Sequence, residues 1–332
     1  MLPKKLLLFL TFAMLGPPVL GQTEYFRLTT VQSLEDLEKE KYQKVNKLVD
    51  FFYNNFESVE KNLEAKKNAW DLLQNYPDDP YLYDLWATIE WASLGHELGT
   101  GLDQQKDVSE FPKLVERAKK YHVIVDQGLR LTDDKNNTES QLARAVLFFD
   151  QAKFTFSFES NTSSLSQVDK ETAEGIKTLK QILEKDSALG PAYFFLGITR
   201  YGLAAKTESW SPKRLVIRLA SYVYYELYSL DNDVFNKSSA LDWVEKGYHY
   251  TCLYPWLKKV WLESALLLFK IYPDYRKGLK LNKELEILET KEVPLLENLA
   301  EILPNRQDVL QGLKLSKLRV RILKDYLSSQ KK

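Results

Sequence analysis

The sequence predicts an all-α protein built from antiparallel helix pairs, and three features of the chain support this prediction. Apolar residues recur at spacings of three and four along most of the chain, as they do on one face of an α-helix. Short segments rich in Pro, Gly, Asp and Asn interrupt these patterns, as turns between paired helices do. No run that alternates between apolar and polar residues has a neighbouring partner run, so no set of β-strands is expected.

The composition is that of a globular protein with a large core. The 332 residues are 44% hydrophobic and 28% charged, with equal numbers of acidic and basic residues. The basic surface that a nucleic-acid partner requires is therefore not expected. Length alone suggests two domains, but a stack of helix pairs forms one continuous body of this size. We expect a single domain over 22–332, divisible into sub-blocks 33–160 and 168–332.

Residues 1–21 have the three-part layout of a secretory signal peptide. A Lys-Lys pair at 4–5 precedes an apolar run over 6–15, and Gly-Pro-Pro at 16–18 breaks the run before a predicted cleavage ahead of Gln22. The run is too short to span a bilayer, and no comparable longer run follows. An uncleaved N-terminal anchor is the alternative. We expect export, to a bacterial periplasm or else by secretion.

Five helices are expected before residue 160. Ser33 is a favourable N-cap for the first, which has acidic residues in its first turns. The segment 77–80 (Pro-Asp-Asp-Pro) is a turn between the second and third helices. Polar segments at 99–110 and 132–138 separate the others. These signals place helices at about 34–56, 57–74, 81–98, 111–131 and 140–158.

A helix hairpin over 171–206 is the clearest element of the chain. Its first helix has one apolar stripe, and a turn containing Asp, Gly and Pro over 186–191 ends it. Its second helix mixes small residues with aromatic ones, so the helix backbones can approach closely there. A serine-rich loop is expected before the hairpin, over 161–166. The stripe consists of Ile176, Leu179, Ile182 and Leu183.

The remainder of the chain is expected to form six further helices. Pro212 is placed to open the first of them, and Pro255, Pro273 and Pro304 mark later junctions. The segment 318–322 alternates like a strand, but the spacing of the apolar residues around it fits a helix better. The predicted helices cover about 212–230, 238–253, 256–271, 275–289, 294–303 and 307–328.

Three helix–turn–helix junctions, at Tyr76-Pro77, Asp186-Ser187 and Tyr254-Pro255, resemble one another. Each leads from small or apolar residues through a turn to an aromatic-rich helix. The pattern resembles the tetratricopeptide repeat over about half of the chain. The junctions are not separated by multiples of that repeat's length, so insertions and degenerate units are expected. The best match, 174–202, includes Gly175, Leu179, Ile182, the turn Glu184-Lys185-Asp186-Ser187, and then Tyr193, Leu196, Gly197 and Tyr201.

This resemblance implies a right-handed superhelix of stacked helix pairs, a TPR-like α-solenoid with a concave groove. Such grooves usually hold a peptide, an extended segment or a partner helix. A few periplasmic relatives of this family are associated with the uptake of small ligands.

The chain shows no catalytic or metal-binding pattern. His96, His122 and His249 are isolated in the sequence, which is typical of surface or packing histidines rather than metal ligands. The one cysteine, Cys252, lies three residues after His249, but a buried structural cysteine is the more usual interpretation. No phosphate loop, dinucleotide fingerprint or nucleophile elbow occurs. We expect no enzymatic activity, no cofactor and no metal.

Aromatic residues are the unusual feature of the second half. Tyr224 and Tyr228 are four residues apart, so a helix would place them on one face. Such residues either pack between helix pairs or line a groove, where tyrosine offers a ring for stacking and a polar tip. If they line a groove, the candidate contacts are Tyr193, Tyr201, Tyr224, Tyr228, Tyr250 and Trp256.

The last 21 residues predict a basic amphipathic helix. They contain seven Lys or Arg and one acidic residue, Asp325. One interpretation is a capping helix that keeps the end of the stack soluble. The other is docking to anionic lipid headgroups or to an acidic partner. The apolar side expected opposite the basic residues consists of Leu315, Leu318, Ile322 and Tyr326.

These features predict a non-enzymatic scaffold of the cell envelope that binds a protein or peptide in the groove of a helical repeat. The alternative is a periplasmic small-ligand-binding or transport accessory protein with an aromatic-lined pocket.

Overall fold

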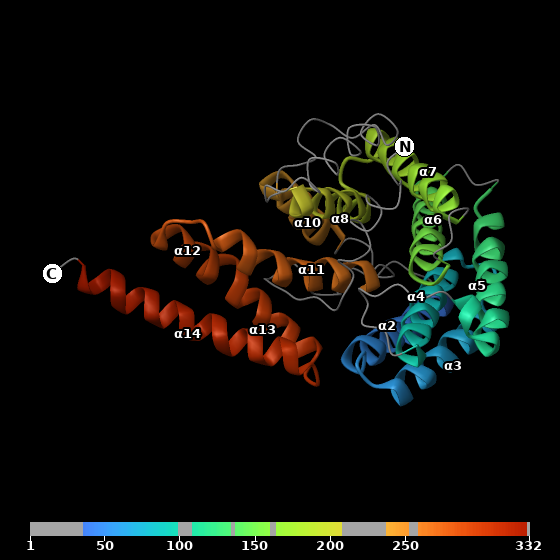
Figure 1. Ribbon diagram of the computed structural model, residues 1–332, viewed down its shortest axis with the longest axis horizontal. Helices are drawn as coiled ribbons and strands as arrows, with labels where there is room; N and C mark the ends of the chain where they lie inside the picture. Colours follow the sequence, from blue (N-terminus) through green and yellow to red (C-terminus); the bar gives the residue numbers. More distant parts are fainter. Residues whose placement is uncertain are drawn as a thin grey trace.

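The computed structural model describes residues 36–98, 108–133, 137–159, 164–207, 237–251 and 258–330 (Figure 1). This part of the chain is all-helical and contains no strand, which confirms that the protein is all-α as predicted. The helices are α2 (Asp36–Asn54), α3 (Val59–Asn75), α4 (Pro80–Glu97), the 3-10 turn η2 (Val108–Glu110), α5 (Pro112–Arg130), α6 (Thr138–Phe158), α7 (Ser164–Lys185), α8 (Gly190–Thr207), α10 (Lys237–Thr251), α11 (Lys258–Arg276), α12 (Leu281–Ile287), the π-helical segment η5 (Leu288–Glu292), α13 (Val293–Ile302) and α14 (Gln307–Ser329).

Helices α2 to α7 pack against one another in chain order. Side-chain caps fix where several of them begin. Ser58, Asp79 and Asn137 precede α3, α4 and α6, and each side-chain oxygen accepts a hydrogen bond from a backbone N–H two or three residues further on. Pro80 and Pro112 occupy the first turns of α4 and α5, where a missing N–H loses no helical hydrogen bond.

The turns of α3–α4 and α7–α8 are built in the same way. In each, the residue after the first helix donates its N–H to the carbonyl four residues earlier. In each, a tyrosine near the start of the second helix reaches back to the turn. Tyr83 Oη donates to the Pro77 carbonyl and Tyr193 Oη donates to the Ser187 carbonyl, both at 2.9 Å. These are two of the junctions that resemble each other in the sequence.

An aromatic cluster fills the core between α3, α4, α5 and α6. The rings of Tyr121 and Phe154 stack with 3.8 Å between centroids. Trp86 lies 5.9 Å from Tyr121 and 6.3 Å from Trp70. Tyr121 is fully buried, and its hydroxyl donates to the carbonyl of Asp150 at 3.1 Å, so its polar end is satisfied inside the core.

Helices α8 and α10 approach very closely because glycines face the neighbouring backbone. A Cβ atom on Gly197 would stand 2.8 Å from the Val244 nitrogen, and one on Gly247 would stand 2.7 Å from the Phe194 nitrogen. The pairing of 197 with 244 and of 194 with 247 shows that the helices are antiparallel. The expectation of close backbone approach around the small residues of α8 is confirmed at Gly197.

The C-terminal helices depart from the predicted boundaries. Helix α11 continues through Pro273 to Arg276, where the sequence predicts a turn. Pro273 lies in the last turn of α11, so its missing N–H removes one hydrogen bond close to the helix end. The predicted break between 289 and 294 is also wrong, because α12, η5 and α13 are continuous. The turn of the π-helical segment η5 is wider than that of an α-helix. Its last residue, the buried Glu292, accepts hydrogen bonds from Arg276 and from Ser316 Oγ, and these bonds hold the segment in place.

One predicted loop is partly helical. Helix α7 begins at Ser164, inside the segment 161–166. Serine is unfavourable in helix interiors but favoured at their starts, so a serine-rich segment can open a helix as well as separate two of them. The predicted cap Ser33, the signal peptide and the helix at 212–230 lie outside the described residues.

Contacts to α2 join the beginning and the end of the described chain. Asn54 Nδ2 donates to the Ile302 carbonyl at 3.0 Å, and buried Arg306 donates to the Tyr53 carbonyl at 3.3 Å. The hydroxyl of Tyr53 donates to Glu263 on α11 at 2.8 Å. Figure 1 shows α14 running from the turn beside α2 to the far tip of the molecule.

Candidate functional site

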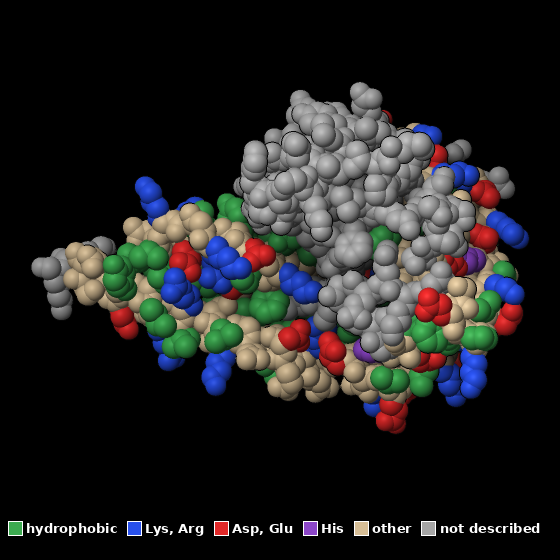
Figure 2. All heavy atoms as spheres, viewed as in Figure 1, with side chains coloured by type: hydrophobic (Ala, Val, Ile, Leu, Met, Phe, Trp, Pro, Cys, Tyr) green, Lys and Arg blue, Asp and Glu red, His purple; other side chains and the backbone are tan. Residues whose placement is uncertain are grey.

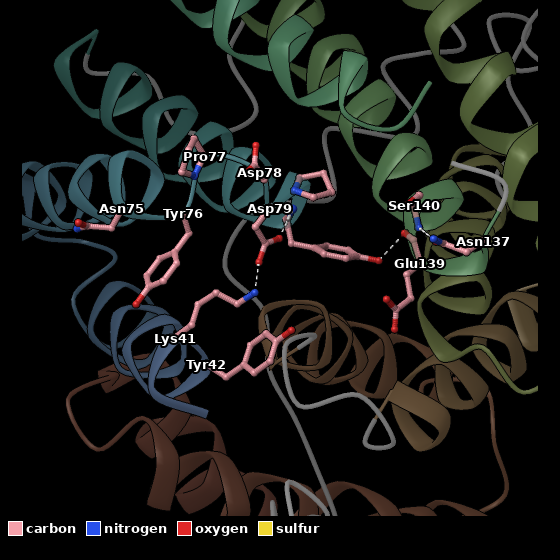
Figure 3. A pocket seen from close by; sticks show the side chains of 12 residues that line it. Lys41, Tyr42, Asn75, Tyr76, Pro77, Asp78, Asp79, Asn137, Glu139 and Ser140 are labelled. Carbon is pink, nitrogen blue, oxygen red and sulfur yellow. Dashed lines mark hydrogen bonds and ion pairs between the residues drawn. The ribbon is translucent and has the colours of Figure 1, made fainter. Parts of the chain in front are cut away.

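A cavity of about 540 Å³ lies where the start of α2, the α3–α4 turn and the start of α6 meet (Figure 3). Segments far apart in the sequence supply its walls. Its lining combines aromatic rings with charged and hydrogen-bonding groups. The side chains used below are Lys41 and Tyr42 from α2, Tyr76, Asp79 and Tyr81 from the turn and α4, and Glu139 from α6.

Asp79 organises the wall of this cavity. One carboxylate oxygen caps α4 by accepting from the Tyr81 N–H at 3.0 Å, and the other lies 2.9 Å from Lys41 Nζ. Both charged side chains are 15% exposed. Burial opposes the charge on Lys41, but the hydrogen bond and the negative charge of Asp79 outweigh it and raise the pKa of Lys41. The ammonium group therefore stays charged beside the cavity.

The aromatic side chains are also held in place. Tyr81 Oη donates to the Glu139 carbonyl at 2.7 Å, which ties α4 to the start of α6. Burial raises the pKa of Tyr81 well above its usual value, so this phenol remains protonated and acts as a donor. The ammonium of Lys41 lies 4.7 Å from the centre of the Tyr42 ring. Rings, hydroxyls and one ion pair equip this cavity for binding, and no nucleophile with an adjacent base lines it.

A second group of unusual residues is a buried charge cluster where α11 meets α4 and α6. Lys259 forms ion pairs with Asp84 and Glu263, and it lies close to Asp150. Burial, and next the charge of Asp84, raise the pKa of Asp150 well above its usual value. Burial and the neighbouring carboxylate thus both disfavour the charged form of Asp150. Lys153 on α6 completes the cluster, with its Nζ 3.7 Å from the centre of the Trp91 ring.

This buried charge cluster is a structural joint rather than a site open to ligands. Asp84, Asp150, Lys153 and Lys259 are each at most 6% exposed, and none of them lines the cavity at the α3–α4 turn. Perturbed pKa values alone indicate a functional site only where a cleft reaches the groups. The cluster instead fixes α11 to the N-terminal helices.

A third cluster joins α5, α6 and α7. His122 Nε2 lies 2.8 Å from Glu159 Oε1, and the hydrogen bond to Glu159 and its charge raise the pKa of His122 despite burial. Burial raises the pKa of Glu171 to about 7, while a hydrogen bond from Gln167 lowers it. Within the described residues, no group of three or more His, Cys, Asp or Glu side chains is placed to hold a metal ion.

The other two histidines, His96 and His249, make packing contacts. His96 Nε2 lies 2.7 Å from the Phe56 carbonyl, which is a packing contact. The ring of His249 contacts Tyr248, and burial lowers the pKa of His249. Cys252 lies outside the described residues, and so does any pairing of it with His249.

Of the six aromatic residues predicted to contact a ligand, two have described side chains. Tyr193 is half-buried, its ring lies against Trp243, and its hydroxyl is bonded to the α7–α8 turn. Tyr201 is 5% exposed and belongs to the core, which corresponds to the packing interpretation. Tyr250 is in α10, but its side chain is outside the described part. Tyr224, Tyr228 and Trp256 are outside it altogether.

Sequence reasoning missed the cavity at the α3–α4 turn. The signal was the run Tyr76-Pro-Asp-Asp-Pro-Tyr81, in which two tyrosines flank a rigid turn. The sequence identifies this run as a turn but does not show that α2 and α6 lie next to it.

Comparison of the chain with family models, curated proteins and solved structures gave no match. In the part of the chain that the structure describes, no helix is both long enough and apolar enough to cross a membrane.

Proposed function

We propose that this protein is a non-enzymatic helical-repeat scaffold that binds a segment of another protein or a peptide. The observation that carries the proposal is the cavity at the α3–α4 turn. It offers tyrosine rings and a shielded Lys41–Asp79 pair on walls that helix caps hold in place. Such a surface suits the backbone and side chains of a peptide, whose polar groups need partners when they lose water.

A TPR-like stack is the architecture that we propose for this scaffold. The identical hydrogen-bond pattern of the α3–α4 and α7–α8 turns supports a repeated unit, as does the chain-order packing of α2 to α7. In a stack of this kind each hairpin turn lies at an edge of the surface that neighbouring pairs create. Export after removal of residues 1–21 is part of the same proposal, and N-terminal sequencing of the protein from its own host tests it.

Native mass spectrometry of the gently purified protein tests the binding function. We expect a co-purifying polypeptide, and we expect Tyr42→Ala to reduce its recovery at least about tenfold, because that change removes one aromatic wall of the cavity. Tyr193→Ala is the matched control, since Tyr193 is another half-buried tyrosine that does not line the cavity. Loss of the polypeptide in Tyr193→Ala but not in Tyr42→Ala would show that the polypeptide binds at the surface near α8 and not in the cavity.

Binding of a small molecule is the second candidate function. The cavity volume of about 540 Å³ lies within the range of pockets that enclose small ligands. In the same experiment this function predicts a bound mass of a few hundred daltons and no polypeptide. A protein that carries neither would contradict both functions.

A further inference from the structure

Helix α14 exposes a continuous apolar stripe. Its residues follow one another at spacings of three, four and four, so they lie on one helix face. Outside α14, the large apolar side chains that the described chain exposes to this degree are Val59, Leu63 and Val123 on α3 and α5. The stripe, called here the α14 stripe, consists of Leu315 (57% exposed), Leu318 (51%), Ile322 (49%) and Tyr326 (50%).

The face of α14 that adjoins the stripe is fixed to the protein, so the helix cannot turn the stripe inward. Gly312 packs so closely on Phe269 that a Cβ would stand within 2.5 Å of the ring. Ser316 Oγ donates to buried Glu292 at 2.6 Å, and Arg319 donates twice to Glu284, at 3.0 Å each. Leu323, 2% exposed, completes the buried face. The α14 stripe therefore faces away from the core by construction.

Basic side chains flank the α14 stripe. At 100° per residue, Lys314 and Arg321 lie on one border of it, and Lys317 and Lys324 lie just beyond them. Lys317 and Lys324 pair with glutamates on neighbouring helices, whereas the structure records no ion pair for Lys314 and Arg321 among its described residues. Figure 2 shows hydrophobic and basic side chains next to one another along the part of the molecule that α12, α13 and α14 form.

We propose that α14 docks the protein on an anionic lipid bilayer, lying in the plane of the interface. The α14 stripe enters the boundary between headgroups and acyl chains, and the flanking Lys and Arg side chains reach lipid phosphates. Two further lysines, Lys331 and Lys332, follow the helix in the sequence and add to the charge. This inference is independent of the proposed peptide binding, because α14 contributes no residue to the cavity.

A lipid surface fits the α14 stripe better than a second copy of the chain does. The stripe spans 315–326, which is less than two heptads, whereas a coiled coil requires about three or four. A parallel pair of copies would also bring Lys314 and Arg321 close to the same residues of the partner helix. An anionic lipid surface would instead attract these positively charged side chains.

Co-sedimentation of the full chain with vesicles tests the proposal. We expect binding to vesicles that contain phosphatidylglycerol, weaker binding to vesicles of phosphatidylcholine alone, and release by salt. The double change Leu318→Glu and Ile322→Glu should reduce binding at least about tenfold, because it places two charges in the apolar stripe. Leu63→Glu is the matched control, since Leu63 is 47% exposed on α3. All variants carry the same N-terminus, so their differences report on α14.

Asp325→Lys gives a test in the opposite direction. Asp325 is the one acidic residue among the last 21, and it lies beside the α14 stripe, so its replacement should tighten binding to anionic vesicles several-fold. Equal binding by wild type, the double variant and the control would overturn the proposal. So would a wild-type dimer in sedimentation that the double variant loses while neither protein binds vesicles, because the stripe would then be an interface between copies.

Discussion

Carboxyl groups buried in the described part of the chain differ in whether they form an ion pair with a Lys or Arg side chain. Asp79, Glu90 and Glu292 each contact a Lys or Arg. Glu171 on α7 contacts a neutral Gln167 and is 4% exposed, and burial raises its pKa from 4.5 to about 7. A carboxyl group that must be protonated to remain buried makes stability depend on pH.

The replacement Glu171→Gln should change that dependence. The folded pKa lies above the unfolded one, so the contribution of Glu171 to stability is complete below pH 4.5 and is lost as pH rises through about 7. The difference in unfolding free energy between Glu171→Gln and wild type should therefore grow in favour of the variant by about 3 kcal/mol across this window. Urea unfolding at a series of pH values measures it.

Glu174→Gln is the control for this series, because Glu174 is on the same helix with its side chain 46% exposed. Glu171 is one of the charges that raise the pKa of His122, so Glu171→Gln should also bring that pKa down, whereas Glu174→Gln should leave both groups unchanged. A flat difference between Glu171→Gln and wild type would mean that Glu171 is ionised in the folded protein.

At the scale of the helix, glycine decides how closely two elements approach. Most helix boundaries could be predicted from Pro and Asp in the turns, as at 77–80 and 186–191. The departures at Pro273 and at η5 depend on Arg276, Glu292 and Ser316, which come from three elements. No local pattern reports such a contact, so the continuity of α12 and α13 was not predictable.

Replacing Gly247 with Ala should destabilise the protein by about 1–3 kcal/mol, because the new methyl group would meet the Phe194 backbone and force α8 and α10 apart. Gly278→Ala is the control, because Gly278 lies in the turn after α11 and nothing lies within 4 Å of its Cβ position. Thermal and urea unfolding measure both changes, and a stabilised Gly247→Ala protein would contradict the packing of these helices.

Across the whole molecule, α11 connects the N-terminal helices to the C-terminal arm through charged contacts. Part of this joint could be predicted: helix α6 has no distinct polar face, and Asp150 and Lys153 lie among its aromatic residues, so their burial could be expected. Their partner Lys259, more than a hundred residues away, could not be. The cavity at the α3–α4 turn could likewise be predicted only in part. The sequence identifies the turn, but it does not show that α2 and α6 lie next to it.

Lys259→Met should lower the unfolding free energy by about 3–5 kcal/mol, because it leaves Asp84 and Glu263 buried without their cation. We expect wild type to unfold in one transition that is the same by circular dichroism and by tryptophan fluorescence. The variant should show separate transitions, because the buried ion pairs that couple its two halves are lost while weaker contacts remain. Lys277→Met, one residue after the end of α11, is the control, since the side chain of Lys277 is 76% exposed. An equal effect of both changes would show that the joint carries no stability.

The contact between α2 and the turn before α14 also sets an order of events during synthesis. Asn54 and its acceptor Ile302 are 248 residues apart, so α2 leaves the ribosome roughly 10–50 s before its last partner does. Throughout that interval α2 lacks its contacts with Ile302 and Arg306. A chain that stops short of Ile302 and Arg306 lacks these two contacts of α2, so α2 is held less firmly in a truncated chain.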